Sequence, residues 1–244
     1  MDSSSELPRQ VSLAKGGQAR ISLDKEDRGV TVTASLQWDG GSAERRARGA
    51  DLDLYALFVP ADAAVRGADH PPGHVFPQIQ RGLFRTRNKD EAKALQAELA
   101  TRTDAGKALY YKNLGSLEEP PYMRLSGDAK APGEETIRIA RPDQQGYALI
   151  CAYSAVSNGA GSFRSYGARV VVTDGRGSTV TVPLYADTNT SYWVAIAFVD
   201  FTDPQGVSIS HVECYSRRFT EKRPVLHTDG TVLMDAGPVE FKRG

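Results

Sequence analysis

The sequence predicts an all-β protein: a two-sheet β-sandwich that carries one inserted loop-and-helix segment. Many short runs alternate apolar and polar residues and are separated by turns rich in Gly, Asp and Pro, a pattern typical of strands. Only one stretch shows apolar residues at helical spacing. A chain of 244 residues with this pattern suits a single sandwich domain.

The predicted strands extend over most of the chain. After a polar N-terminus, residues 1–10, that we expect to be flexible, a single domain over 11–244 is expected. The 147–153 run is apolar on both faces, which predicts a central strand packed on both sides. Asp174-Gly175-Arg176-Gly177 predicts a hairpin turn. The expected strands cover residues 19–23, 30–38, 49–59, 108–111, 122–125, 136–139, 147–153, 168–173, 178–184, 191–201 and 207–215.

Residues 60–107 differ in composition from the rest and are expected to form an insertion between strands. Several prolines interrupt regular structure at its beginning. Further along, Ala92, Leu95 and Leu99 fall at helical spacing, which predicts one amphipathic helix over about 89–101.

Composition limits the function classes. Lys plus Arg and Asp plus Glu both number 30, so the chain lacks the basic excess of a protein that grips nucleic acid. The apolar runs are strand-sized, and the acidic N-terminus does not resemble a secretion signal, so we expect a cytoplasmic protein. Cys151 and Cys214 lie in apolar runs and are expected to be buried thiols. Trp38 and Trp193 lie in strands and are expected in the core.

Paired carboxylates begin the predicted strand 49–59. Side chains alternate along a strand, so residues two apart lie on the same face. Asp51 and Asp53 should therefore share one face with Tyr55 and Leu57. The other face, made of Leu52, Leu54, Ala56 and Phe58, should enter the core. Carboxylates two residues apart are separated by roughly 6–7 Å, close enough to bracket one cation. Without a cation or a basic partner they repel each other.

An ordered set of motifs resembles the TerD family, the tellurium-resistance and general stress proteins of bacteria. These motifs are Val11-Ser12-Leu13-Ala14-Lys15-Gly16-Gly17, Trp38-Asp39, Ala50-Asp51-Leu52-Asp53, Gly127-Asp128, Gly133-Glu134-Glu135-Thr136-Ile137 and the segment Ser162 to Val170. The resemblance covers most of the chain apart from residues 60–107 and the C-terminal tail.

The resemblance implies a sandwich that binds Ca²⁺ through carboxylates. The positions that match the family's ligands are Asp51, Asp53, Asp128, Glu134 and Glu135. Carboxylate and carbonyl oxygens are the ligands that Ca²⁺ prefers. The chain departs from the family after Asp128, where Ala129 and Lys130 follow in a shortened loop. Lys130 offers an alternative, in which it pairs with the carboxylates and the site is an ion-pair patch with no metal.

Three functions remain open. The first is a non-enzymatic, Ca²⁺-binding interaction module whose partners are other proteins of a stress or tellurite-resistance system. The second is a glycoside hydrolase that uses paired carboxylates, which needs one carboxyl with a raised pKa and a second roughly 5–10 Å away. The third is a Ca²⁺-dependent membrane-surface module, in which the loop cations Arg45, Arg46 and Arg48 meet anionic headgroups. No nucleophile–base motif or phosphate loop occurs, which favours a protein that is not an enzyme.

Overall fold

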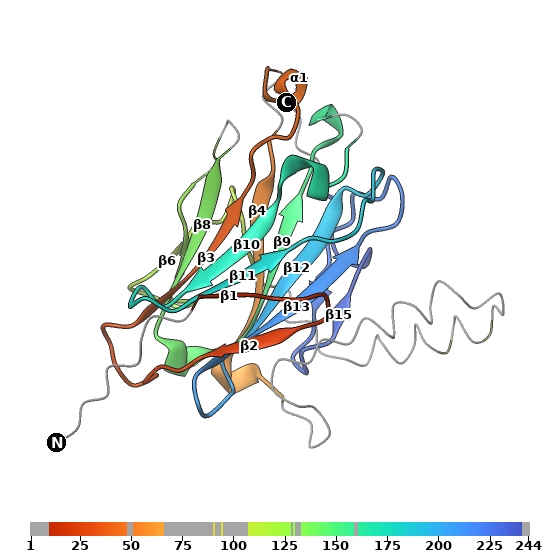
Figure 1. Cartoon of the computed structure of the whole chain (residues 1–244). Helices are drawn as coiled ribbons and strands as arrows, with labels where there is room; N and C mark the ends of the chain where they lie inside the picture. The colour runs from red at the N-terminus through yellow and green to blue at the C-terminus, as the bar shows by residue number, and fades with distance from the viewer. Residues whose placement is uncertain are drawn as a thin grey trace.

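Two facing β-sheets make up most of the protein. The computed structural model describes residues 10–47, 51–65, 90, 94, 107–127, 129, 133–158 and 161–240. In these ranges the chain is built almost wholly of strands, and Figure 1 shows the two main sheets stacked on each other. The predicted all-β sandwich is therefore confirmed. Most of the insertion 60–107, with nearly all of the helix expected over 89–101, lies outside the described residues.

Sheet A has seven strands. Their spatial order is β1 (Gln10–Ser12), β11 (Thr179–Pro183), β10 (Arg169–Thr173), β3 (Thr31–Gln37), β8 (Glu134–Ala140), β7 (Met123–Leu125) and β6 (Gly115–Ser116). β1 runs parallel to β11, and the other neighbouring strands pair antiparallel. The β10–β11 hairpin turns at the predicted Asp174, whose Oδ1 accepts hydrogen bonds from the backbone N–H groups of Arg176 and Ser178.

Sheet B has six strands. Their order is β2 (Gln18–Ile21), β13 (Val207–Tyr215), β12 (Trp193–Asp200), β9 (Gln145–Tyr153), β4 (Asp53–Pro60) and β5 (Ala108–Leu109). The expected central strand is β9, and all of its residues are buried. The smaller elements are α1 (Ala43–Ala47), β14 (Val225–Leu226), β15 (Val232–Leu233) and the 3-10 turns η1 (Ala61–Ala63), η2 (Pro142–Gln144), η3 (Val156–Asn158) and η4 (Arg164–Tyr166).

The main core lies between the two sheets. In β3, Val32, Ala34 and Leu36 are fully buried, while the residues between them face outward and are less buried on average. Leu54 and Phe58 of β4 enter the same core from sheet B. This alternation follows from the two-residue period of a strand, and it is the feature that the sequence pattern predicts best.

A second core covers the outer face of sheet B, contrary to our expectation for β4. Tyr55 and Leu57 are buried there with Trp193 and residues of the β14–β15 ribbon. The C-terminal segment is tied to this face because its backbone carbonyls at Glu221 and Glu240 accept hydrogen bonds from Trp193 and Tyr153. The strand expected to have one core face is therefore buried on both sides.

The structure also describes both cysteines, both tryptophans and the character of the helices. Cys151 is buried, Cys214 is half-buried, and both are free thiols. Trp38 and Trp193 both lie in the protein interior, as expected. Among the described helices, none has the length and apolar character to cross a bilayer.

The C-terminal layer gives a prediction about stability. Leu226 is 2% exposed in the second core, so Leu226→Ala should lower the free energy of unfolding by about 2–5 kcal/mol through lost burial and a residual cavity. Denaturant titration measures this change. Leu114→Ala is the control, because Leu114 is 37% exposed and its truncation should cost less than about 1 kcal/mol. Equal effects in the two variants would contradict a packed C-terminal layer.

Candidate metal centre

Four strands of sheet B begin or end together at one end of the sandwich, which we call the loop end. Asp53 at the start of β4 pairs with Tyr153 at the end of β9, and Tyr153 also pairs with Trp193 at the start of β12. The end of β13 lies beside them, since Tyr215 pairs with Val194. In sheet A, Glu134 begins β8 at the same end (Figure 1). The loops that join these strands therefore gather in one region.

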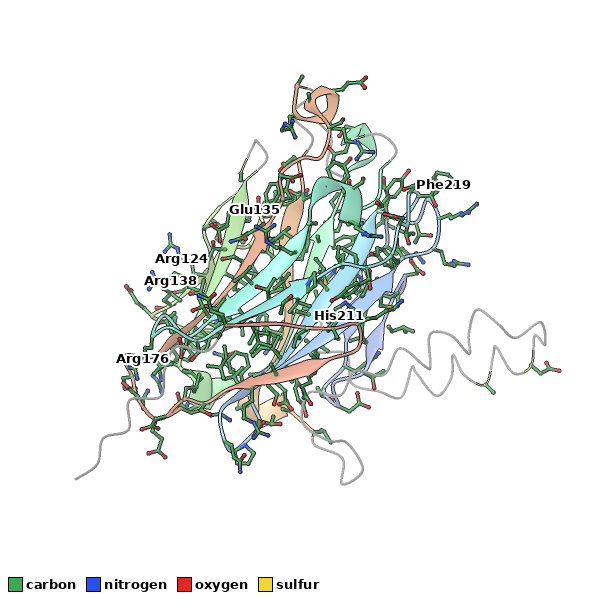
Figure 2. All side chains as sticks on the ribbon, viewed as in Figure 1. Arg124, Glu135, Arg138, Arg176, His211 and Phe219 are labelled. Carbon is green, nitrogen blue, oxygen red and sulfur yellow. The ribbon has the colours of Figure 1, made fainter. Side chains whose placement is uncertain are left out.

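Glu135 connects the two sheets at the loop end. It is only 2% exposed, because it occupies an inward position of β8 opposite Leu36. Its Oε2 accepts a hydrogen bond from the backbone N–H of Leu54 in sheet B at 2.7 Å. Its Oε1 accepts a second from the N–H of Ala129, in the β7–β8 loop, at 2.9 Å. One side chain thus joins β8, β4 and a loop, and Figure 2 labels its place in the protein.

The surroundings of Glu135 oppose its ionisation. The pKa of this carboxyl is raised to about 8, mainly by burial and in smaller part by the carboxylates of Asp53 and Asp51. The two backbone N–H donors act in the opposite direction, because a hydrogen bond to the charged form stabilises it. Three carboxyl groups therefore lie close enough to influence one another's charge.

Asp53 and Asp51 lie at the start of β4. Asp53 is the first residue of the strand and is 2% exposed, and Asp51 precedes the strand and is half-buried. The side chain of Asn158 fixes the backbone of Asp51, since its Oδ1 accepts from the Asp51 N–H and its Nδ2 donates to the Asp51 carbonyl. The predicted Asp pair is thus placed by contacts with the β9–β10 connection.

Of the other predicted ligands, Glu134 is not brought into this group. Glu134 is exposed and accepts a hydrogen bond from Gln37 on the outer face of sheet A, opposite to the face of Glu135. The cause is that β8 begins at Glu134, so adjacent side chains point to opposite faces. Asp128, and Lys130 as its alternative ion-pair partner, lie outside the described residues.

The donor set suits a hard cation. Carboxylate oxygens are the ligands that Ca²⁺ and Mg²⁺ prefer, whereas softer metals select thiolates and imidazoles. Within the described ranges, no group of three or more His, Cys, Asp or Glu side chains has an arrangement that could hold a metal ion. The carboxylates of Asp51, Asp53 and Glu135 have the oxygen donors that a hard cation prefers, but as arranged in the described part of the chain they do not form a metal site, and further oxygen ligands are needed to complete one.

Arg45 and Arg46, expected in a loop, lie in the short helix α1 and contact the protein itself. The guanidinium carbon of Arg45 lies 4.8 Å from the centre of the Tyr166 ring, and its Nη1 donates to Ser165 at 2.6 Å. Arg46 donates to the carbonyl of Gly41. Arg48 lies outside the described residues. Arg45 and Arg46 thus have intramolecular roles that the sequence interpretation did not foresee.

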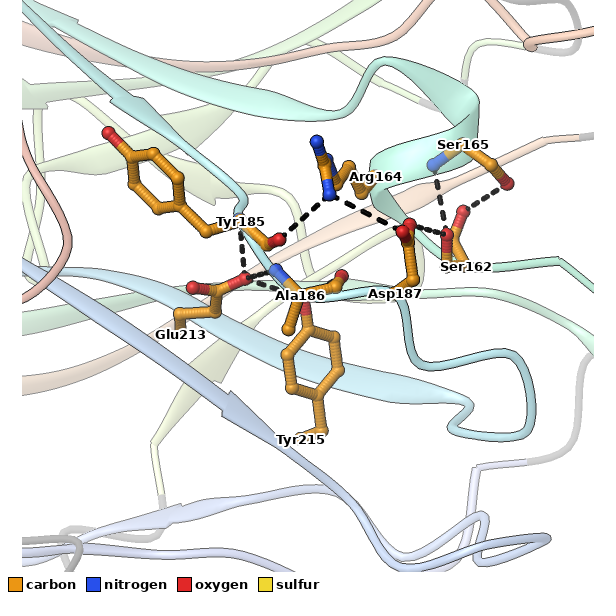
Figure 3. Close-up of polar contacts among 8 residues, drawn as sticks. All are labelled: Ser162, Arg164, Ser165, Tyr185, Ala186, Asp187, Glu213 and Tyr215. Atoms are coloured by element: carbon orange, nitrogen blue, oxygen red, sulfur yellow. Dashed lines mark hydrogen bonds and ion pairs between the residues drawn. The ribbon is translucent and has the colours of Figure 1, made fainter.

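A second polar cluster at the loop end was missed by sequence reasoning (Figure 3). Glu213 Oε1 accepts hydrogen bonds from the backbone N–H groups of Tyr185 and Ala186, both at 2.6 Å, and from the hydroxyl of Tyr215 at 3.0 Å. Arg164 donates to the Tyr185 carbonyl and also pairs with Asp187 at 3.3 Å. Glu213 is the one acidic residue of the predicted strand 207–215, and this was the signal in the sequence that its carboxylate needed a partner.

Comparisons with known proteins give likenesses of fold. No protein-family model and no curated protein matches the chain. One similar solved structure is a homologue of the telluride resistance protein TerD from Streptomyces coelicolor A3(2), with 14% identity and a TM-score of 0.40 over 78% of this chain and 90% of that chain. Another is a protein of unknown function, with 11% identity and a TM-score of 0.41 over 86% of this chain and 92% of that chain.

The raised pKa of Glu135 predicts how stability changes with pH. The folded protein holds a proton on Glu135 up to about pH 8, whereas the unfolded chain releases it near 4.5. The contribution of Glu135 to the free energy of unfolding is therefore fully present below pH 4.5 and is lost as the pH rises to about 8. Over this range the unfolding equilibrium constant rises by up to about tenfold per pH unit. Denaturant titrations between pH 5 and 9 should show this slope in the wild type.

The variant Glu135→Gln should remove the slope, because an amide does not titrate. Glu134→Gln is the control and should retain it, since this neighbour lies on the outer face of sheet A. The same pH dependence in Glu135→Gln and in the wild type would contradict the raised pKa.

Proposed function

We propose that this protein is a non-enzymatic, Ca²⁺-binding interaction module of a bacterial stress or tellurite-resistance system. The observation that carries the proposal is the grouping of Asp51, Asp53 and Glu135 at the loop end, where each carboxylate disfavours the charge on Glu135. A bound cation would remove this repulsion and stabilise all three charges. The site would thus couple the presence of Ca²⁺ to the order of the surrounding loops.

The residues that would hold the ion have distinct roles in this proposal. Asp51 and Asp53 supply carboxylate oxygens from the start of β4. Glu135 holds β4 and the β7–β8 loop together, and a carboxylate whose oxygens each accept one N–H still has lone pairs for a cation. Asp128, which the family resemblance assigns to the same site, precedes Ala129 in the chain. Bound Ca²⁺ would supply charge neutralisation and cross-linking, not chemistry on a substrate.

The cellular setting in this proposal comes from the sequence motifs. The ordered motifs from Val11 to Val170 resemble those of the TerD family, whose setting is tellurite resistance and the general stress response. We expect other proteins of that system as partners, and a cytoplasmic location with no nucleic-acid ligand.

The glycoside hydrolase alternative has less support. Glu135 meets the requirement for a carboxyl with a raised pKa near other carboxylates. However, it is 2% exposed and both of its oxygens accept backbone hydrogen bonds, so it is not available to protonate a glycosidic oxygen. The membrane-surface alternative is weakened because Arg45 and Arg46 bind groups of their own protein.

Isothermal titration of Ca²⁺ into chelator-stripped protein tests the proposal. The wild type should bind Ca²⁺ at micromolar concentration, within the range of protein calcium sensors. The double variant Asp51→Asn/Asp53→Asn should lose binding by a factor of about 100 or more, because two ligand charges are removed.

Glu134→Gln is the matched control, since it removes one carboxylate from the outer face of the same strand. It should leave Ca²⁺ binding unchanged. Absence of heat at millimolar Ca²⁺, or equal loss in the control and the double variant, would refute a calcium site at these residues.

A further inference from the structure

A polar pocket of about 960 Å³ opens at the loop end, and none of its lining residues belongs to the candidate metal centre. It lies between the segment that leads into β12 and the segment that follows β13. Its lining residues are Asp187, Thr188, Asn189, Thr190, Ser191, Ser216, Arg217, Arg218 and Thr220. A pocket of this size has room for a ligand as large as a nucleotide.

The two segments that form the pocket are held together by hydrogen bonds. The N–H of Phe219 donates to the Thr190 carbonyl at 3.0 Å, and Ser191 Oγ donates to the Ser216 carbonyl at 2.8 Å. Ser216 Oγ in turn accepts from the Trp193 N–H at 3.2 Å, at the start of β12. The walls are therefore preformed, which lowers the entropic cost of binding a ligand.

The charges around the pocket leave one positive group in excess. Asp187 pairs with Arg164 at 3.3 Å, and Arg217 pairs with Asp235 at 3.8 Å. Arg218 makes no ion pair or hydrogen bond with any residue in the described part of the chain. Its guanidinium is suited to a phosphate, which it can bind through two parallel hydrogen bonds.

Phe219 lies next to Arg218 in the chain and is unusual in two respects. Its φ is +57°, a left-handed conformation that costs a bulky residue about 1–3 kcal/mol. Its side chain is also 69% exposed, and Figure 2 shows it at the margin of the molecule. An exposed aromatic held in a strained conformation beside a pocket offers a surface on which a planar ring can stack.

The rest of the lining is rich in hydroxyl groups. Threonine and serine side chains both donate and accept hydrogen bonds, and they suit the hydroxyls of a sugar and the oxygens of a phosphate. The lining threonines are Thr188, Thr190 and Thr220.

We propose that this pocket binds a small nucleotide. Arg218 holds the phosphate, Phe219 stacks on the base, and the hydroxyl side chains between them contact the sugar. This site shares no residue with the proposed calcium site and does not depend on it.

Isothermal titration of the full chain with AMP, adenosine and inorganic phosphate, in chelator to exclude metal, tests the proposal. AMP should bind, and adenosine and phosphate should each bind at least about tenfold more weakly, because each lacks one of the two anchors. No heat with millimolar AMP overturns the proposal. If phosphate binds as tightly as AMP, the pocket is an anion site only. If adenosine binds as tightly as AMP, Arg218 has no role in binding. Either result overturns the nucleotide proposal.

Two variants locate the site. Arg218→Gln removes the cation, and Phe219→Gly removes the ring while glycine adopts φ +57° without strain, so both proteins should remain folded. Each should weaken AMP binding by about tenfold or more. Arg124→Gln is the control, an exposed arginine of β7 in sheet A, and it should leave AMP binding unchanged. Retained affinity in either variant, or an equal loss in the control, overturns the assignment.

Discussion

The Glu135 carboxyl is the contact on which the loop end of this protein depends. It is a side chain of sheet A that accepts a hydrogen bond from the backbone of sheet B, at Leu54, and from the β7–β8 loop, at Ala129. A carboxyl in this position is costly to ionise because it is buried and because two further carboxyl groups raise its pKa. A nearby cation would stabilise the charged form of the group that joins the sheets, and in our proposal that cation is Ca²⁺.

The sequence predicted the fold well because strand periodicity is a local signal. The inward residues of β3 and the doubly buried β9 follow directly from alternation and from a continuous apolar run. The C-terminal layer was not predicted, because β14 and β15 have only two residues each and carry almost no periodic pattern. For this reason Tyr55 and Leu57, which lie under that layer, were not recognised as core residues.

The candidate site was predicted in part. Asp51 and Asp53 are identified by spacing, and both affect the charge on Glu135, but their role as metal ligands stays a prediction. Glu134 was grouped with Glu135 because the pair matches the acidic doublet of the TerD-like motifs. In the structure β8 begins at Glu134, which places the two side chains on opposite faces. The Glu213 cluster and the pocket at Arg218 join segments distant in sequence, so only the folded chain shows them.

The most direct test of this account is the titration of Glu135 itself. NMR of protein with ¹³C-labelled glutamate, assigned with Glu135→Gln, reports the pKa of this carboxyl with and without Ca²⁺. The account predicts a midpoint near 8 in the metal-free protein and a much lower midpoint with saturating Ca²⁺. A midpoint near 4.5 in the metal-free protein, or one that Ca²⁺ leaves unchanged, would contradict the central claim.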